Sequence, residues 1–218
     1  EGTTLVVLSS TTDSLYLAPM VAVSLEAGYA SNVVALPVST SPFQVKRNAF
    51  SSKGFNVTEI ASDVKVIAVA KNSFGLVEAS GAAAAEDFAP SLNDADFSIK
   101  VENVEKVSGK VAIADAEIVV SGGRGLKGPE NWGMVEELAS VLGAATACSK
   151  PVSDLDWRPH SEHVGQTGKP VAANLYIAIG ISGAIQHIAG INASKVKVVI
   201  NSDPEAPFFK VADYGIVG

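Results

Sequence analysis

The chain opens with short, continuous apolar runs that are separated by polar or glycine-containing segments. Such runs of four to eight residues are typical of buried strands, and they lie here at residues 5–8, 33–38 and 64–70. Between the first two, apolar residues recur at helical spacing over 14–27. Because proline is best tolerated in a first turn, we expect this helix to begin near Pro19 and to be capped by Gly28.

The segment after the second run alternates weakly between apolar and polar residues. Residues 42–60 predict a hairpin with Gly54 in its turn. Residues 71–93 combine small residues with acids and are expected to be exposed. Phe97, Ile99 and Val101 alternate with polar residues, which predicts one more strand.

From about residue 113 onwards, strand and helix patterns alternate. Strands are predicted at 118–120, 144–148, 175–179 and 196–200, and the end of the chain is also strand-like. Helices are predicted at 129–142 and 183–189, ended by Gly143 and Gly190, while 149–170 is expected to be a polar loop. This order predicts an α/β protein with a doubly wound parallel sheet in a domain of residues 113–218, preceded by a partial α/β domain of residues 1–112.

Composition narrows the class of protein. The 218 residues carry a formal net charge of −7, which disfavours nucleic-acid binding. The longest apolar stretches fall well short of the roughly 20 residues that cross a bilayer, so no membrane insertion is expected. The single cysteine, Cys148, permits no internal disulfide and fits a reducing compartment. Both ends of the chain fall in strand-like runs, so we expect a piece of a longer protein.

The first candidate site is a glycine loop between a predicted strand and helix. Gly123, Gly125 and Gly128 match the G-x-G-x-x-G pattern, in which glycines let a phosphate approach the backbone at a helix N-terminus. The acid that should follow after about 20 residues to hold a ribose hydroxyl is replaced by Ser149-Lys150. A plain tight turn is the alternative, although the cation Arg124 favours a ligand.

Two further glycine loops follow predicted strands. Residues 164–169 lack the spacing of a Walker loop and offer neutral hydrogen-bonding groups. In residues 180–187, Ser182 is a natural N-cap, and Gly183 and Ala184 would present bare amides. His187 lies one turn further on. Because the carboxyl ends of parallel strands share one edge, we expect the three loops to converge there.

Other candidate groups are weaker. His160 and His163 flank Glu162 and could hold a metal, but no further ligand is near in sequence, so a solvated loop is the preferred interpretation. Cys148 lies in an alanine-rich strand without an evident histidine partner, so a buried small hydrophobe is expected rather than a nucleophile.

Residues 118–217 resemble the FAD-binding domain of the electron transfer flavoprotein alpha subunit family. The resemblance runs through the blocks 119–127, 164–169, 175–190, 203–207 and 211–217 without any change of spacing. Residues 1–112 resemble the back part of the first domain of that family more weakly.

The resemblance implies FAD, a partner beta subunit and one-electron transfer, within fatty acid β-oxidation, from acyl-CoA dehydrogenases or related flavoenzymes to a quinone reductase. It implies a cytoplasmic location in a bacterium and the mitochondrial matrix in a eukaryote. Thr167 would hydrogen-bond near flavin N5, His187 would face the C2 carbonyl, and Asn201 would serve the adenosine half. Residues 182–184 would serve the phosphates. The implied cofactor-binding residues are Arg124, Ser149, Lys150, Val164, Gly165, Gln166, Thr167, Ser182, Gly183, Ala184, Ile185, Gln186, His187 and Asn201.

Lys197 and Val199 depart from the usual residues of their strand, which we interpret as packing variation, but one other departure from the family matters for the site. Lys150 stands where the family usually has arginine, so the charge is retained but the planar group that could stack on a flavin ring is lost. A cation and a hydrogen-bonding histidine near the pyrimidine end would favour the one-electron-reduced anionic flavin. Two alternatives stay open: an NAD(P)-dependent oxidoreductase that uses the first glycine loop, and a nucleotide-binding assembly subunit without flavin.

Overall fold

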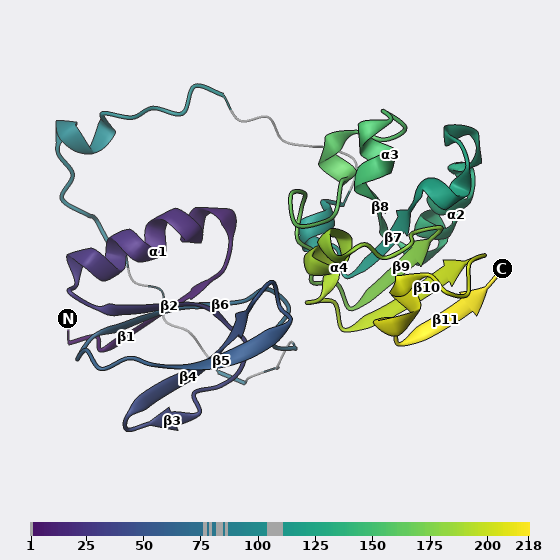
Figure 1. Cartoon of the computed structure of the whole chain (residues 1–218). Coiled ribbons are helices and arrows are strands. Elements are labelled where there is room, and N and C mark those ends of the chain that lie inside the picture. Colours follow the sequence, from purple (N-terminus) through teal and green to yellow (C-terminus); the bar gives the residue numbers. More distant parts are fainter. Residues whose placement is uncertain (1, 76–77, 79, 82–84, 86, 104–110) are drawn as a thin grey trace. The chain divides into compact units, whose positions relative to one another are not determined.

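The computed structural model describes residues 2–75, 78, 80–81, 85, 87–103 and 111–218. Residues 2–74 and 111–218 hold all the strands of this described part, in two sheets, and each sheet is considered by itself (Figure 1). Within residues 75–110, the described part has one short 3-10 turn, Asp94–Phe97. The predicted strand over 97–101 is therefore wrong: Ile99 and Val101 are exposed and lie outside any strand. The described residues of 75–93 are exposed, as predicted.

The N-terminal sheet has a parallel and an antiparallel part. Strands β1 (Leu5–Ser9), β6 (Lys65–Val69) and β2 (Gly28–Val33) run parallel. Strand β4 (Phe43–Ala49) pairs antiparallel with β2, and β3 (Ser39–Thr40) and β5 (Gly54–Glu59) pair antiparallel with β4. The predicted hairpin is confirmed as β4–β5, but Gly54 begins β5, and the left-handed residues Phe50, Ser51 and Ser52 make the turn.

Helix α1 (Thr12–Ser24) begins earlier than predicted. Thr11 caps it by accepting a hydrogen bond from the Ser14 backbone N–H at 3.2 Å, so Pro19 lies inside the helix. The side-chain cap and the buried face outweigh the one hydrogen bond that Pro19 removes. Gly28 does not cap this helix but starts β2, so the second strand is 28–33 and not 33–38. A Cβ on Gly28 would lie 2.4 Å from Ile60 Cγ2, which accounts for the glycine.

The C-terminal sheet is fully parallel, in the order β11-β10-β9-β7-β8. Its strands are β7 (Ile118–Gly122), β8 (Ala145–Cys148), β9 (Leu175–Ile179), β10 (Val196–Asn201) and β11 (Tyr214–Val217). Counted along the chain this is the order 2-1-3-4-5, which confirms the predicted doubly wound fold. The chain moves from β7 outwards to β8 and then returns to the other side at β9. Ligand crevices form at the carboxyl ends of strands at such a reversal.

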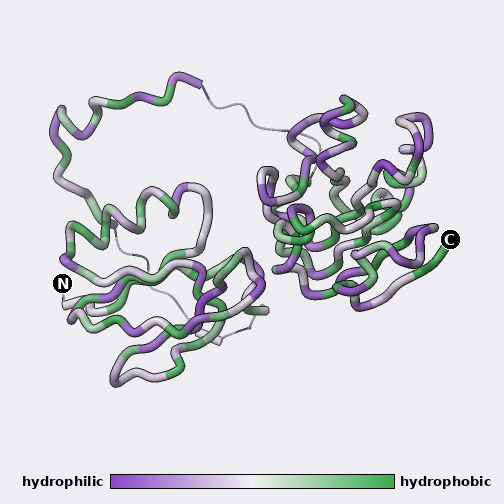
Figure 2. The backbone as a smooth tube through the Cα atoms, viewed as in Figure 1, coloured by the Kyte–Doolittle hydropathy of each residue, from purple (hydrophilic) through white to green (hydrophobic). Residues whose placement is uncertain are grey.

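Two buried clusters cover the two faces of this sheet. On one face, Trp132, Val135 and Ala139, which lie just before and within α2 (Gly133–Leu142), pack on Val120 and Ile177. On the other face, α4 (Ile185–Ile191) and the Phe208 turn pack on Val119 and Tyr176. In Figure 2 hydrophobic residues gather in the central strands of this sheet.

The helices of this part differ from prediction at their ends. A 3-10 turn, Pro129–Asn131, precedes α2, so the regular helix is shorter than 129–142, although Gly143 does end it with a left-handed φ of 62°. The predicted polar loop 149–170 contains a short helix, α3 (Lys150–Asp154), and a 3-10 turn, His160–Glu162. Gly190 lies within α4 and does not end it.

Candidate cofactor site

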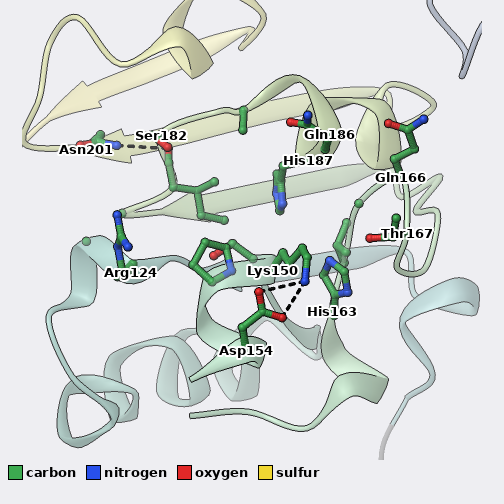
Figure 3. A pocket seen from close by; sticks show the side chains of 18 of the residues that line it. Arg124, Lys150, Asp154, His163, Gln166, Thr167, Ser182, Gln186, His187 and Asn201 are labelled. Carbon is green, nitrogen blue, oxygen red and sulfur yellow. Dashed lines mark hydrogen bonds and ion pairs between the residues drawn. The ribbon is translucent and has the colours of Figure 1, made fainter. Parts of the chain in front are cut away.

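A cavity of about 640 Å³ lies at the carboxyl ends of β7, β8, β9 and β10. Arg124 follows β7, Ser149 and Lys150 follow β8, Ser182 follows β9 and Asn201 ends β10 (Figure 3). The predicted convergence of the three glycine loops is confirmed, because all three line this cavity. Every residue predicted for the site lines it except Gly183, which is buried behind the loop, and Ile185, which is exposed.

The first glycine loop is held by protein and not shaped around a phosphate. A Cβ on Gly123 would lie 2.1 Å from the Gly180 carbonyl oxygen, and one on Gly125 would lie 2.7 Å from Gly180 Cα. The Gly125 N–H donates to the same carbonyl at 2.9 Å. These glycines are therefore required because the loops after β7 and β9 touch backbone to backbone.

The expectation that a helix N-terminus follows this loop directly is wrong. A 3-10 turn, Arg124–Leu126, and another after Gly128 follow the loop, and α2 begins only at Gly133. No helix N-terminus therefore faces a phosphate from this loop, within the described chain. A Cβ on Gly128 would meet the side chain of Glu130.

The second and third loops are joined in the same way. The Gln166 N–H donates to the Gln186 carbonyl at 2.7 Å. A Cβ on Gly190 would lie 2.6 Å from Gly165 Cα, so a glycine inside α4 lets the second loop lie directly against the helix. This explains why Gly190 does not act as the predicted helix stop.

The third loop presents backbone donors. Ser182 is not an N-cap, since Ala184 precedes α4 and no side chain caps the helix. The Ser182 carbonyl instead accepts from the Phe208 N–H at 3.0 Å, while Gly183 has a φ of 90° and packs against the Phe208 backbone. Among the described residues, the N–H groups of Ser182, Gly183 and Ala184 donate to no acceptor. Consecutive free amides of this kind suit an anionic oxygen.

His187 is buried, lines the cavity and forms a hydrogen bond with a buried tyrosine. Its Nε2 lies 2.9 Å from the Tyr176 hydroxyl. Burial lowers the pKa of His187 to about 4, so the ring is neutral at pH 7. A polar contact with the Val164 backbone raises this pKa and partly offsets burial, but it falls outside ordinary hydrogen-bond geometry, and Nδ1 has no partner of ordinary geometry among the described residues.

Two cations line the cavity in different electrostatic states. Within the described chain, the exposed Arg124 guanidinium has no ion-pair or hydrogen-bond partner. Lys150 Nζ lies 2.7 Å and 2.8 Å from the two carboxylate oxygens of Asp154, one helical turn further on (Figure 3). The hydrogen bond from Lys150 lowers the pKa of Asp154, so the carboxylate is ionised near neutral pH.

Asn201 uses both ends of its amide within the protein. Its Nδ2 donates to the Ile181 carbonyl at 3.1 Å, and its Oδ1 accepts from the Asp203 N–H at 3.0 Å. Asn201 therefore fixes the loop after β9 to the end of β10.

Sequence reasoning did not predict seven of the residues that line the cavity. They are Gly125, Pro151, Asp154, His163, Gly180, Ile181 and Asp203. Asp154 follows Lys150 by four residues, a spacing at which side chains meet only on a helix. Because a loop was predicted there, the sequence did not reveal this ion pair. His163 is buried, so the solvated-loop interpretation is wrong for it, although His160 is exposed. The cause is a β-bridge between His163 and Cys148, which draws the segment against β8.

Neither metal binding nor thiol chemistry gains support. The described residues contain no group of three or more histidine, cysteine or acidic side chains that could hold a metal ion. Glu162 pairs with Arg158 at 2.7 Å. Burial raises the pKa of the Cys148 thiol to about 12, as expected for an inert buried cysteine.

At the reversal of the parallel sheet lie a buried histidine, backbone amides and a guanidinium, the last two without partners in the described part of the chain. Together they define a nucleotide-type cofactor domain. Comparison with known proteins gives the particular family. The electron transfer flavoprotein FAD-binding domain matches residues 112–192, and the electron transfer flavoprotein domain matches residues 1–93.

Curated relatives agree over most of the chain. The electron transfer flavoprotein subunit alpha of Pseudomonas aeruginosa is 41% identical over 212 residues, which is 97% of this chain and 68% of the relative. That of Bacillus subtilis is 42% identical over 205 residues, 93% of this chain and 62% of the relative. The mitochondrial subunit alpha of Dictyostelium discoideum is 44% identical over 181 residues, which is 79% of this chain and 51% of the relative. The chain belongs to the electron transfer flavoprotein alpha subunit family, and it spans about two thirds of the length of the two bacterial relatives.

FAD is the cofactor of the matched domain, and the residues present fit it. The free amides of Ser182 and Ala184, which line the cavity, and the Arg124 guanidinium suit the negatively charged pyrophosphate. His187 Nδ1 is a buried polar atom that lacks a hydrogen bond of ordinary geometry with the described residues. No helix within the described residues is both long and apolar enough to cross a membrane.

Proposed function

We propose that this chain is the FAD-carrying part of an electron carrier. The observation that supports it most is that residues from three separate glycine loops, singled out on sequence grounds, line one cavity. Bound FAD would supply the redox chemistry, since a flavin can gain and lose electrons one at a time or in pairs. The protein would supply binding, orientation and electrostatics.

Each part of the cavity has a proposed role. The amides of 182–184 and the Arg124 guanidinium would hold the pyrophosphate, and Asn201 would lie at the adenosine half. Thr167 would donate near flavin N5, and His187 would face the C2 carbonyl. Ser149, Lys150, residues 164–166, Ile185 and Gln186 would complete the contacts.

We further propose an obligate partner, a beta subunit of the same carrier. The relatives are named as alpha subunits, which supports an assembly of unlike chains. Donors would be acyl-CoA dehydrogenases or related flavoenzymes, and the acceptor a quinone reductase. The location would be cytoplasmic in a bacterium or the mitochondrial matrix in a eukaryote, and the chain would divide into domains of residues 1–112 and 113–218. Size-exclusion chromatography of the co-expressed chains should give a one-to-one complex, whereas a stable flavin-loaded monomer would contradict this.

The two alternatives lose support to different degrees. A nicotinamide enzyme would need the first glycine loop for its phosphates, but Gly123 and Gly125 are occupied by the Gly180 backbone. A flavin-free assembly subunit would use the same amides for a mononucleotide, so only the bound ligand separates it from the carrier.

A visible spectrum of the chain co-purified with its beta subunit tests the proposal. Yellow protein with the bands of oxidised flavin, carrying one FAD per complex, supports it. Colourless protein that binds NADH would support the oxidoreductase, and colourless protein that binds only AMP would support the assembly subunit. Either colourless result, after incubation with excess FAD, contradicts the proposal.

A further inference from the structure

Tyr176 and His187 form a buried pair behind the cavity. Tyr176 lies on β9 and His187 on α4, with 2.9 Å between the phenol oxygen and Nε2. Tyr176 is fully buried and His187 is 6% exposed. Phe208, also fully buried, faces the same imidazole with ring centroids 6.2 Å apart. The His187 ring therefore packs against two buried aromatic side chains.

We propose that Tyr176 is a positioning residue that holds His187 as the tautomer with its proton on Nδ1, so that the imidazole offers the bound cofactor one fixed hydrogen-bond donor. The part of this that concerns the cofactor rests on the function proposed above. The tautomer itself does not, because the Tyr176–His187 contact is made within the chain.

The argument for the tautomer begins with the protonation state. Burial holds the His187 pKa near 4, so at neutral pH the ring carries one proton, on either Nδ1 or Nε2. Burial also raises the pKa of Tyr176, so the phenol keeps its proton. In the 2.9 Å contact, one partner must therefore donate a proton and the other must accept it: either the phenol donates to Nε2, or a protonated Nε2 donates to the phenol oxygen.

The surroundings of the phenol decide the direction of this hydrogen bond. The Ser121 hydroxyl acts on the Tyr176 pKa, but its Oγ forms no hydrogen bond of ordinary geometry. Nε2 is thus the one well-placed acceptor for the phenol proton among the described residues. A buried hydroxyl that donates to nothing is costly, so Tyr176 donates and Nε2 accepts. The proton of His187 is then on Nδ1, because the partner of one ring nitrogen sets the state of the other.

This tautomer leaves a donor for a ligand. Nδ1 is buried and forms no hydrogen bond of ordinary geometry within the described chain. Buried polar atoms are rarely left in that state in folded proteins. Since His187 lines the cavity, an acceptor on the cofactor would complete the hydrogen bonding, and Tyr176 would act on the cofactor only through His187.

Nitrogen NMR of histidine-labelled protein tests the tautomer in the complex with the beta subunit. We expect the His187 signals, assigned by their loss in His187→Gln, to show a protonated Nδ1 and an unprotonated Nε2 at pH 7. Tyr176→Phe removes only the hydroxyl, and the signals should move towards a mixture of tautomers. Tyr214→Phe, at an exposed tyrosine, should leave them unchanged. A protonated Nε2 in the parent, or an unchanged tautomer in a folded Tyr176→Phe protein, would overturn the proposal.

A second readout concerns the cofactor. Tyr176→Phe should weaken FAD binding about three- to tenfold, as expected for the loss of one well-placed hydrogen bond, and Tyr214→Phe should not. If the tautomer changes in Tyr176→Phe while FAD affinity and flavin potential stay at the parent values, Tyr176 does not position a cofactor contact. If the parent protein binds no FAD at all, the proposed function fails, while the NMR result still decides the tautomer.

Discussion

Lys150 and Asp154 form a two-pronged ion pair at the edge of the cavity, with Nζ 2.7 Å and 2.8 Å from the two carboxylate oxygens. The sequence predicts a lysine that brings a lone positive charge to the flavin. The structure pairs that charge one helical turn away, and both side chains are about half exposed. A paired and solvated cation acts more weakly on a nearby group than a lone one.

The first prediction concerns the separate effects of the Lys150 and Asp154 charges on the reduction potential of the bound flavin. Lys150→Ala should lower the first reduction potential of the bound flavin, because it leaves the Asp154 carboxylate unbalanced beside it. Asp154→Asn should raise that potential, because it frees the lysine. Each shift should stay below roughly 59 mV, a tenfold change in a one-electron equilibrium. Stepwise reductive titration measures both.

The double variant Lys150→Ala/Asp154→Asn is the control for the pair. Its potential should return close to that of the parent, and Lys150→Arg should also stay close because it keeps the charge. If Asp154→Asn leaves the potential unchanged while Lys150→Ala lowers it, Lys150 acts as a lone cation and the pairing has no redox effect. If neither variant shifts the potential, neither residue lies in the field of the flavin.

The second prediction concerns the contact between glycine loops. Gly123→Ala should lower the free energy of unfolding by about 1–3 kcal/mol, because its Cβ would overlap the Gly180 carbonyl. Gly133→Ala is the matched control: its Cβ would meet no atom within 4 Å at the start of α2, and it should stabilise by about 0.4–1 kcal/mol. Urea unfolding measures both. A Gly123→Ala protein that is as stable as the parent but has lost FAD would restore the phosphate-loop interpretation.

The third prediction is a pH dependence of stability from His187. The unfolded residue binds a proton below about pH 6.5, whereas burial delays this to about pH 4 in the folded protein. The unfolded state therefore binds more protons between these values, and stability falls as the pH falls through this window. At pH 4, the protonation of His187 should account for a loss of about 3 kcal/mol in the free energy of unfolding, from 1.36 kcal/mol per pKa unit.

Urea unfolding of the parent and of His187→Gln at pH 7, 5.5 and 4.5 isolates this loss, because the carboxylates titrate in both proteins. The parent should lose more stability than the variant as the pH falls. Parallel pH profiles would mean that His187 is not buried as a neutral ring.

Periodicity predicts the parallel sheet of residues 118–217 well, because its central strands β7 and β9 are apolar runs, as expected of buried strands, and each ends at or just before a glycine. The N-terminal part is predicted less well. Thr11 caps α1 through a contact three residues on, and the capped helix then tolerates Pro19. The role of Gly28 depends on Ile60, a neighbour 32 residues away that local patterns do not reveal.

The location of the cavity was predictable, and most of the predicted residues line it, but Gly183 and Ile185 do not, and its internal contacts were not predictable. Parallel strands bring their carboxyl ends to one edge, so the three loops had to meet. Sequence alone could not show that Gly123 faces Gly180 and not a phosphate, or that Tyr176 lies behind His187. The first relationship joins two loops that lie 57 residues apart, and the second joins a strand and the helix that follows it, so neither appears in a local sequence pattern.

The most direct test of the central claim, that these loops form an FAD site, is an equilibrium titration of cofactor-stripped complex with FAD, followed by flavin fluorescence. Arg124 lines the cavity and its guanidinium has no partner in the described chain, so Arg124→Ala should weaken FAD binding roughly 10- to 150-fold, for a charge-assisted contact of about 1.5–3 kcal/mol. Lys127→Gln, at a neighbouring exposed cation that does not line the cavity, should bind like the parent. A folded Arg124→Ala protein with the affinity of the parent would contradict the account.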